Sequence, residues 1–337
     1  MQAILFTSIF IGFILTAILL PKWIKKCREV GLLWEDMNKF KHPRNVAASG
    51  GIIVVMAFVV GVLSYVAIRT FFISYNSVNL EIFALLSVIL ILAIVGLTDD
   101  LLGWKHGGLS ARFRVFLAFL SSIPLVVINA GVHEISIPFF RSINLGIFYP
   151  LVLIPLGIAG ATTTYNFLAG FNGLEAGQGI IILSFLSFVA YATGSSWLAL
   201  IGLIMVSCLV VFYFYNKFPA KVFPGDILTY SIGALIASMA ILGNFEKIAV
   251  FVFTPYIIET GLKLRGKLKK ESFAIPEKDG SLRLPYKKIY GLTHLAVLIL
   301  SKFKKKVYER DVVYLIFIFQ ILICLVGLVI FRGGIFR

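Results

Sequence analysis

Acidic residues, histidines and cysteines are scarce in this chain of 337 residues, which holds 16 Asp and Glu, 4 His and 3 Cys. One cysteine lies in a basic segment and two lie in apolar runs, so no disulfide framework is expected. Neither the phosphate-binding sequence G-x-x-x-x-G-K-[ST] nor the zinc-binding sequence H-E-x-x-H occurs. The chain is therefore not expected to be a P-loop nucleotide hydrolase or a zinc protease of that class.

Long apolar runs dominate the sequence. Apolar residues make up 59% of it, charged residues 14%, and the mean hydropathy is +0.97. A transmembrane helix needs about 20 mostly apolar residues, and about ten such runs are present. The expected spans are 2–21, 47–68, 80–98, 113–130, 147–165, 179–193, 197–215, 227–243, 247–262 and 312–331. The runs predict an all-α polytopic membrane protein that forms one integral membrane domain over residues 1–337, with no separate soluble domain.

The distribution of basic residues predicts the orientation. The net charge of +15 would suggest a nucleic-acid partner in a soluble protein. Here 26 of the 31 Lys and Arg lie in, or directly beside, alternate loops between the spans. These loops are 22–45, 99–112, 166–178, 216–226 and 263–311. Because basic loops stay in the cytoplasm, both termini are expected outside, these loops inside, and no nucleic-acid partner is expected.

One polar loop stands out between two apolar runs. It begins N-F-L-A-G-F-N-G-L-E at Asn166 and contains no Lys or Arg up to Gly179. Asn166, Asn172 and Glu175 offer amide and carboxylate groups, and Gly170 lets the backbone approach a ligand closely. The alternative is a tight interhelical turn in which the Asn side chains cap helix ends.

Carboxylates gather at the same membrane face. Asp99 and Asp100 follow the span 80–98, and Asp226 opens the span 227–243. Inserting an acidic residue at the bilayer centre costs about 2.5–3.5 kcal/mol, and less near the interface. An adjacent pair is therefore expected to bind a cation, to pair with another residue or to have a functional role. The simpler interpretation of Asp99 and Asp100 is a pair of solvated carboxylates at a helix end, and that of Asp226 is a helix N-cap. The nearby aromatic Phe223 favours a ligand site for Asp226.

Cations and polar side chains occur in the other loops on this face. Arg112 and Arg114 precede the fourth span, and Arg suits bidentate phosphate recognition. The first loop carries the polar segment Asp36-Met-Asn38-Lys39. In all, the loops supply hard oxygen ligands and phosphate-seeking cations, which is the inventory for Mg²⁺-assisted phosphoryl transfer.

The long basic loop 263–311 contains Arg265, Lys267 and Arg283. Its Asp279-Gly280 turn lies between two short apolar segments, which predicts a small hairpin over the cytoplasmic face. An interfacial helix is expected between this hairpin and the last span.

These motifs resemble those of the polyprenyl-phosphate N-acetylhexosamine-1-phosphate transferases. The resemblance rests on Asp99-Asp100, on the loop from Asn166 to Gln178 and on Phe223-Pro-Gly-Asp226, and it covers nearly the whole chain. It is strongest toward the archaeal and eukaryotic dolichyl-phosphate GlcNAc-1-phosphate transferases. It implies a ten-span enzyme that transfers N-acetylhexosamine-1-phosphate, with GlcNAc as the default sugar, from a UDP-sugar to a polyprenyl or dolichyl phosphate and releases UMP. It also implies Mg²⁺, with Mn²⁺ as an alternative.

Carried over position by position, the resemblance gives roles to individual residues. Asp99, Asp100 and Asp226 become catalytic, and Asn166 and Asp226 become metal ligands. Asp99 either deprotonates the acceptor phosphate or orients it. The remaining positions become substrate-binding residues, namely Asp36, Asn38, Lys39, Arg112, Arg114, Gly170, Asn172, Glu175, Phe223, Arg265, Lys267 and Arg283. Among these, Gly170 and Asn172 are expected at the uracil, and Phe223 is expected to stack on it.

The sequence departs from the family in four places and leaves one other class open. Arg114 is the nearest counterpart of a Lys that follows the Asp-Asp pair in the family, and Ala48 lies near the position of a frequent acidic residue. The triple-His stretch of the muramyl-pentapeptide branch and the Arg-His-Arg of the eukaryotic loop are both absent. A polytopic transporter or lipid-carrier flippase is the alternative, although the polar residues gather at one face instead of lining a path. The expected partners are a UDP-N-acetylhexosamine, the lipid phosphate and membrane lipids, with a homodimer left open. The expected location is the cell membrane of an archaeon or bacterium, or the endoplasmic reticulum of a eukaryote.

Overall fold

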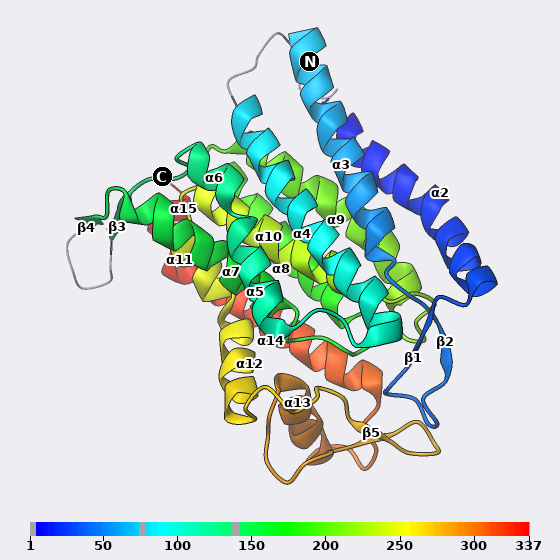
Figure 1. The fold of residues 1–337 in the computed structure, drawn as a ribbon. Coiled ribbons are helices and arrows are strands. Elements are labelled where there is room, and N and C mark those ends of the chain that lie inside the picture. Colours follow the sequence, from blue (N-terminus) through cyan, green and yellow to red (C-terminus); the bar gives the residue numbers. More distant parts are fainter. Residues whose placement is uncertain (1–4, 74–77, 137–141, 337) are drawn as a thin grey trace.

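The computed structural model describes residues 5–73, 78–136 and 142–336, and these form a bundle of helices with three small hairpins (Figure 1). The helices are α2 Thr7–Val30, α3 Gly51–Ile68, α4 Asn79–His106, α5 Ala111–Leu120, α6 Ile123–Val127, α7 Ile154–Tyr165, α8 Leu174–Ala192, α9 Ser196–Asn216, α10 Asp226–Leu242, α11 Glu246–Val252, α12 Thr254–Arg265, α13 Leu292–Ser301, α14 Glu309–Ile330 and α15 Arg332–Ile335. Two π-helical segments, η1 Arg69–Ile73 and η2 Tyr149–Leu153, adjoin α3 and α7.

The three hairpins are antiparallel and each has two strands. They pair β1 Leu33–Glu35 with β2 Arg44–Ala47, β3 Glu134–Ser136 with β4 Ser142–Asn144, and β5 Ile275–Pro276 with β6 Leu282–Arg283. The β5–β6 pair confirms the hairpin predicted around Asp279-Gly280, where Gly280 has a φ of +81°. The predicted helix before the last span is present as α13.

Six described helices are long and apolar enough to cross a membrane, which supports the prediction of a polytopic membrane protein. They are Thr7–Val30, Gly51–Phe72, Asn79–Gly103, Leu174–Ala192, Ser196–Asn216 and Glu309–Ile330. The α10 helix, at 17 residues, is shorter. The prediction of one continuous helix was wrong for two of the remaining spans, which divide into α5 with α6 and into α11 with α12. The third, η2 with α7, runs without a break but begins with a π-helical segment.

Proline favours a new helix start at both breaks. α6 and α12 each have a proline in their first turn, Pro124 and Pro255. A proline has no backbone N–H and its ring crowds the preceding turn, so it is accommodated best in the first turn of a helix.

Two other helices run further than the sequence suggested. The span expected to end at residue 98 continues as α4 to His106, so Asp99 and Asp100 lie within a helix and not in a loop. The first helix likewise continues to Val30 before the chain turns into β1. The cytoplasmic loops predicted at 22–45 and 99–112 are therefore partly helical.

The α10 helix forms the centre of the bundle, with α4, α7 and α8 packed around it (Figure 1). Every residue from Ile227 to Ile241 is buried. Small residues allow the helices to approach closely. A Cβ at Gly233 would lie 2.7 Å from the Ala161 carbonyl oxygen of α7, and a Cβ at Gly96 of α4 would lie 2.6 Å from the backbone of Asp226. Packing through small residues is typical of membrane helices.

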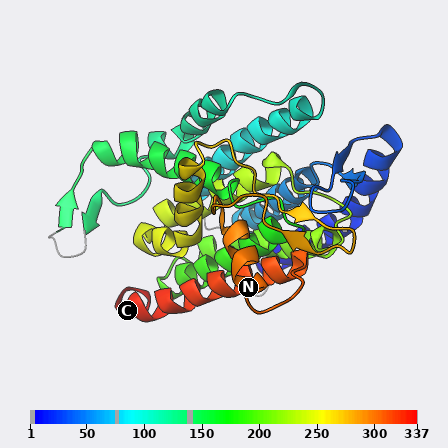
Figure 2. The ribbon, with the colours of Figure 1, turned by 90° about the horizontal axis from the view of Figure 1, so that it is seen from below.

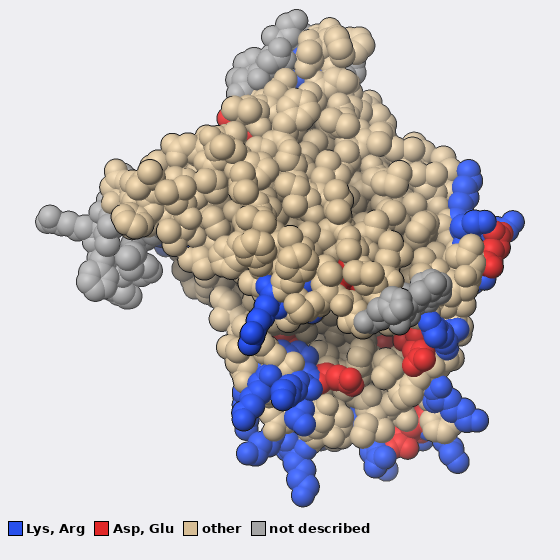
Figure 3. Space-filling view, in the orientation of Figure 1, with Lys and Arg blue, Asp and Glu red and all other residues tan. Residues whose placement is uncertain are grey.

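Basic residues concentrate at one end of the molecule, over the loops near α12, α13 and β5 (Figure 3). In the same view, the part of the surface away from this end is almost entirely uncharged. Seen from below, the segment that carries β5, β6 and α13 spreads across this end of the bundle (Figure 2). This arrangement is the charge asymmetry expected from the distribution of Lys and Arg along the sequence.

The close contact of α4 with α10 can be tested through Gly96. A Gly96→Ala substitution places a methyl group 2.6 Å from backbone atoms that cannot rotate away, so we expect the free energy of unfolding to fall by about 1–3 kcal/mol. Gly261→Ala in α12 is the control, because nothing lies within 4 Å of its added Cβ. Thermal melting in detergent should show destabilisation only for the first variant. Equal melting temperatures would contradict the close packing.

Candidate functional site

The first turn of α10 carries Asp226, and it is held by a carboxylate from α4. The backbone N–H groups of Asp226 and Ile227 donate to the two oxygens of Asp100, at 2.8 and 3.4 Å. The first N–H groups of a helix have no partner within the helix and favour a negative charge. Gly225 precedes this turn with a φ of +72°, and a Cβ there would lie 2.2 Å from Asp100 Oδ2. Asp100 thus caps α10, and Asp226 is not the N-cap but the first residue within the helix.

Arg114 joins the other two carboxylates. It lies in the first turn of α5, and its Nη1 donates to Asp99 Oδ2 at 2.7 Å and to Asp226 Oδ2 at 3.1 Å. The three carboxylates around one guanidinium leave an excess of negative charge, because Asp100 lies beside the same turn. A partly buried group of this kind attracts a further cation. The predicted residues Asp99, Asp100, Arg114 and Asp226 are therefore brought together.

Asn166 completes this cluster from the end of α7. Its Nδ2 donates to Asp226 Oδ1 at 3.1 Å, while its Oδ1 accepts from the Thr229 hydroxyl at 3.1 Å. Carboxylate and amide oxygens are the ligands that suit Mg²⁺, which normally keeps several waters or substrate oxygens. No group of three or more His, Cys, Asp or Glu able to enclose a metal occurs in the described part of the chain. Asp226 and Asn166 would offer such a metal two oxygen ligands and leave its other positions to water or substrate oxygens.

A cavity of about 390 Å³ opens beside this cluster. Arg114, Asn166 and Gly170 line it on the side of the bundle. The segment after α12 closes the other side with Lys270, Glu271, Ser272 and Phe273, and the rest of the lining includes Tyr230 and Lys263. A cleft with a few convergent polar groups is the usual form of a small-molecule site. Sequence reasoning had missed Tyr230, although it lies one turn after Asp226 on the same helix.

Lys263, also missed from the sequence, holds the outer wall of this cavity. Its Nζ donates to Ser272 Oγ at 2.6 Å and to the Lys270 carbonyl at 3.1 Å. Glu259 lies one helical turn before it, at 3.9 Å, a spacing that could have drawn attention to the pair. Lys263 directly follows the predicted span 247–262. Burial lowers the pKa of His294 in α13, whose Nε2 lies 3.3 Å from the Phe273 carbonyl oxygen.

A second polar cluster centres on the buried Glu309 at the start of α14. Its carboxylate accepts from the backbone N–H of Asn172 at 2.7 Å and forms an ion pair with Lys39. The Asn172 amide nitrogen also donates to Asp36 at 3.0 Å, and Asn38 reaches the same Glu309 at 3.5 Å. Of the predicted first-loop residues, Asp36 thus contacts Asn172 directly, whereas Asn38 and Lys39 join it through Glu309. Their role in substrate binding stays a prediction. The sequence did not indicate a role for Glu309, because a single Glu before an apolar run is typical of an ordinary helix start.

Gly170 connects the two clusters. Its N–H donates to Glu175 Oε1 at 2.8 Å, and its carbonyl accepts from Asn38 Nδ2 at 2.7 Å. Its φ of +98° is in the left-handed region, and a Cβ would lie 2.7 Å from the ring of Phe273. A glycine is therefore required at this position. Glu175 is buried and binds the loop backbone, so in this structure it shapes the loop that carries Gly170.

The remaining predicted residues lie apart from the cavity. Asn172 lines a different cavity of about 110 Å³, together with Lys217 and Arg310. Phe223 is half-buried, and its backbone binds Ala47 and Gly50. The side chains of four basic residues point elsewhere or lie exposed: Arg112 and Lys267 are exposed, Arg265 lies over the Tyr290 ring, and Arg283 pairs with Glu277. The uracil contacts of Asn172 and Phe223 stay predictions.

Replacing Glu309 tests the second cluster. Glu309→Gln keeps the size but removes the charge that accepts from Asn172 and pairs with Lys39, so we expect the free energy of unfolding to fall by about 2 kcal/mol. Asp311→Asn, in the same helix and paired with the exposed Lys304, should cost at most about 1 kcal/mol. Thermal melting of both variants measures the difference. Equal losses would show that the buried cluster adds nothing specific.

Comparison with known proteins identifies relatives along the whole chain. Residues 82–244 match the model of glycosyl transferase family 4. A putative UDP-N-acetylglucosamine–dolichyl-phosphate N-acetylglucosaminephosphotransferase of Sulfolobus acidocaldarius is 34% identical over 325 residues, which cover 96% of this chain and 94% of the relative. The enzyme of that name from Dictyostelium discoideum is 28% identical, over 77% and 72% of the two chains. A phospho-N-acetylmuramoyl-pentapeptide-transferase of Clostridium botulinum is 33% identical, over only 58% and 61%.

Proposed function

Because the chain belongs to glycosyl transferase family 4, we propose that it is a membrane phosphotransferase that moves N-acetylglucosamine-1-phosphate from UDP-N-acetylglucosamine to dolichyl or another polyprenyl phosphate. UMP is the second product. The archaeal relative of this name is 34% identical over 96% of the chain, whereas a muramyl-pentapeptide relative that covers 79% of the chain is 26% identical, and one that is 33% identical covers 58%. The higher identity over nearly the whole chain supports N-acetylglucosamine over the muramyl donor.

The observation that carries the proposal is the guanidinium of Arg114 between Asp99 and Asp226 at the edge of the cavity. In the proposed reaction an oxygen of the acceptor phosphate attacks the sugar-bearing phosphorus of the donor. The bond from that phosphorus to the bridging oxygen breaks, and this oxygen leaves with UMP. One phosphoanhydride replaces another, so the protein needs mainly to align the phosphates and neutralise their charge.

Each residue of the cluster has a place in this scheme. Arg114 holds the acceptor phosphate, and Asp99 keeps the guanidinium in position through their bond of 2.7 Å. Asp226 and Asn166 would hold Mg²⁺, which supplies positive charge to the donor diphosphate. Asp100 keeps Asp226 in place by capping α10. Lys263 acts indirectly, by fixing the cavity wall through Ser272.

An apolar groove supports a lipid acceptor. It encloses about 470 Å³ between α7, α10 and the pair α11–α12. Gly160 and Thr164 of α7 line the groove, while Thr163 of the same helix and Asn166, directly after it, line the polar cavity. A lipid tail that lies along α7 therefore ends with its phosphate near Arg114. The isoprenoid chain itself binds through buried CH₂ groups, each worth about 0.8 kcal/mol.

The proposal extends to the placement of the protein. We infer ten spans with both termini outside, in which α5–α6, η2–α7, α10 and α11–α12 supply the four spans beyond the six long helices. The concentration of basic residues at the end that carries the cavity supports a cytoplasmic site (Figure 3). The archaeal relatives support the cell membrane as its location.

The activity can be tested with purified full-length protein, UDP-N-acetylglucosamine, dolichyl phosphate and Mg²⁺. We expect a lipid-linked diphospho-sugar and UMP in equal amounts, and reversal of the reaction when UMP is added. Asp226→Asn should lower kcat by at least about 100-fold, because an electrostatic contact in the transition state is lost. Asp279→Asn is the matched control, since Asp279 is an exposed residue paired with Lys306.

Two outcomes would contradict the proposal. If Asp226→Asn retains the wild-type rate at saturating Mg²⁺, Asp226 is not part of the reacting site. If the wild-type protein releases no UMP but moves a substrate across proteoliposome membranes, the protein is a transporter and not a transferase.

The lipid groove has its own test. Gly157 lines it, and nothing lies within 4 Å of an added Cβ. Gly157→Leu should place a side chain in the groove and raise the KM for dolichyl phosphate by about tenfold, the equivalent of about two lost CH₂ contacts. The KM for the UDP-sugar should not change. Gly261→Leu, also open but outside the groove, is the control. An equal rise in both KM values would argue against a tail in this groove.

A further inference from the structure

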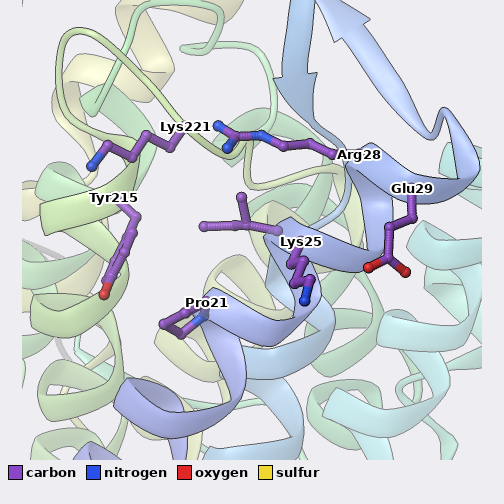
Figure 4. Close-up of a pocket in the computed structure, with 7 residues that line it drawn as sticks. Pro21, Lys25, Arg28, Glu29, Tyr215 and Lys221 are labelled. Carbon is purple, nitrogen blue, oxygen red and sulfur yellow. The ribbon is translucent and has the colours of Figure 1, made fainter.

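A second charged cavity lies away from the Arg114 cluster, between the ends of α2 and α9. It encloses about 500 Å³ and is lined by Pro21, Ile24, Lys25, Arg28, Glu29, Tyr215 and Lys221. Figure 4 shows Arg28 extending from α2 toward the loop that carries Lys221, with Tyr215 on the facing wall. None of these residues belongs to the two polar clusters described above. The volume is within the usual range for a small-molecule site, about 300–1,000 Å³.

The cavity carries unbalanced positive charge. It has three cations and one carboxylate, and that carboxylate, Glu29, is paired at 3.2 Å with Lys26 outside the cavity. Within the described ranges Lys25 and Arg28 form no ion pair, and the Lys221 ammonium lies over the Tyr215 ring, 5.9 Å from its centre. Basic residues at helix ends are common for topological reasons. Topology does not require three of them to share a cavity with an aromatic ring and the buried Ile24.

The position of the cavity matches the surface of the bilayer. Lys25 and Arg28 lie in the last two turns of α2, which is a candidate span over Thr7–Val30, and Tyr215 lies in the last turn of the candidate span Ser196–Asn216. Two spans therefore end at this cavity. Tyrosine, lysine and arginine are the residues that favour the headgroup region of a membrane.

An exposed apolar strip leads from the cavity along α2 into the bilayer. Its members are Phe10, Ile14 and Ile18, whose exposed fractions are 65, 51 and 51%. With Pro21, Lys25 and Arg28 they recur every three or four residues, so all lie on one face of the helix. A cationic cavity at the headgroup level that continues into an apolar strip suits a molecule with a charged head and a hydrocarbon tail.

We propose that this cavity binds the phosphate headgroup of an anionic membrane phospholipid, whose acyl chains lie along the exposed face of α2. Arg28 and Lys221 approach the phosphate from two sides and Lys25 from below, while the Tyr215 ring packs against the glycerol region. The site is separate from the acceptor groove along α7, and it does not depend on the transferase proposal.

The test measures lipid affinity on full-length protein. Native mass spectrometry counts the phosphatidylglycerol molecules retained as its amount in the micelles is increased, with phosphatidylcholine as the neutral probe. The variant Lys25→Gln/Arg28→Gln/Lys221→Gln should bind phosphatidylglycerol about 100-fold more weakly, since each cation near a membrane surface contributes about fivefold. The control Lys22→Gln/Lys41→Gln/Lys302→Gln removes the same charge from exposed positions outside the cavity and should keep the wild-type affinity.

Several results would overturn the proposal. If the cavity variant keeps the wild-type affinity for phosphatidylglycerol, the cavity does not bind the lipid. If the control variant loses as much affinity, the binding depends on general surface charge and not on this cavity. Displacement of phosphatidylglycerol by inorganic phosphate at equal concentration would identify the ligand as a free anion and not a lipid. If the triple variant does not fold, Arg28→Gln alone should still weaken binding by about fivefold.

Discussion

The capping of α10 by Asp100 is the interaction on which the site depends. A helix that is buried along its whole length cannot satisfy its first N–H groups with water, so the partner must come from the protein. Asp100 supplies it from α4, and the close approach at Gly96 and the φ of +72° at Gly225 make the geometry possible. Asp226 belongs to the same turn, so the cap fixes the position of the carboxylate that Arg114 and Asn166 contact.

The charge balance of this cluster has a chemical consequence. Three carboxylates, Asp99, Asp100 and Asp226, lie near the single guanidinium of Arg114. Such an excess of negative charge at a membrane face is costly, and a divalent cation would balance it. A phosphate alone would add to the excess, so the cluster fits the proposal that Mg²⁺ binds together with the phosphates.

Local sequence patterns predicted much of this structure. Hydropathy located the long helices, the Asp279-Gly280 turn located β5–β6, and scarce acidic residues in basic loops pointed to Asp99 and Asp226. Charged residues near a membrane span are informative because burying a charge in the membrane is costly, so they are rare unless they have a role. Helix ends were less predictable. Asp99 and Asp100 were assigned to a loop because their polarity ends the apolar run, whereas the bond of Asp100 to α10 lets α4 continue.

Contacts between distant segments could not be read from the sequence. Glu309 binds Asn172, which is 137 positions away, and Lys39, which is 270 positions away, and no local pattern marks such partners. The residues of loop 263–311 were predicted as a basic group. In the structure Lys263 and Phe273 line the cavity, whereas Arg265 lies over the Tyr290 ring and Arg283 pairs with Glu277. Charge alone does not distinguish them, because topology favours every basic residue in this loop equally.

Asn38 joins the two polar clusters into one unit. Its Nδ2 binds the Gly170 carbonyl at the cavity, its Oδ1 accepts from the Ala274 N–H in the outer wall, and it also reaches Glu309. A ligand that shifts the backbone at Phe273 would also disturb the neighbouring Ala274, its bond to Asn38 and the contacts of Asn38 with Glu309. Buried hydrogen bonds of this kind are costly to leave unpaired. The wall of the cavity, the first loop and the start of α14 are thus expected to shift together, so that the basic segment after α12 moves as part of the site and not as an independent loop.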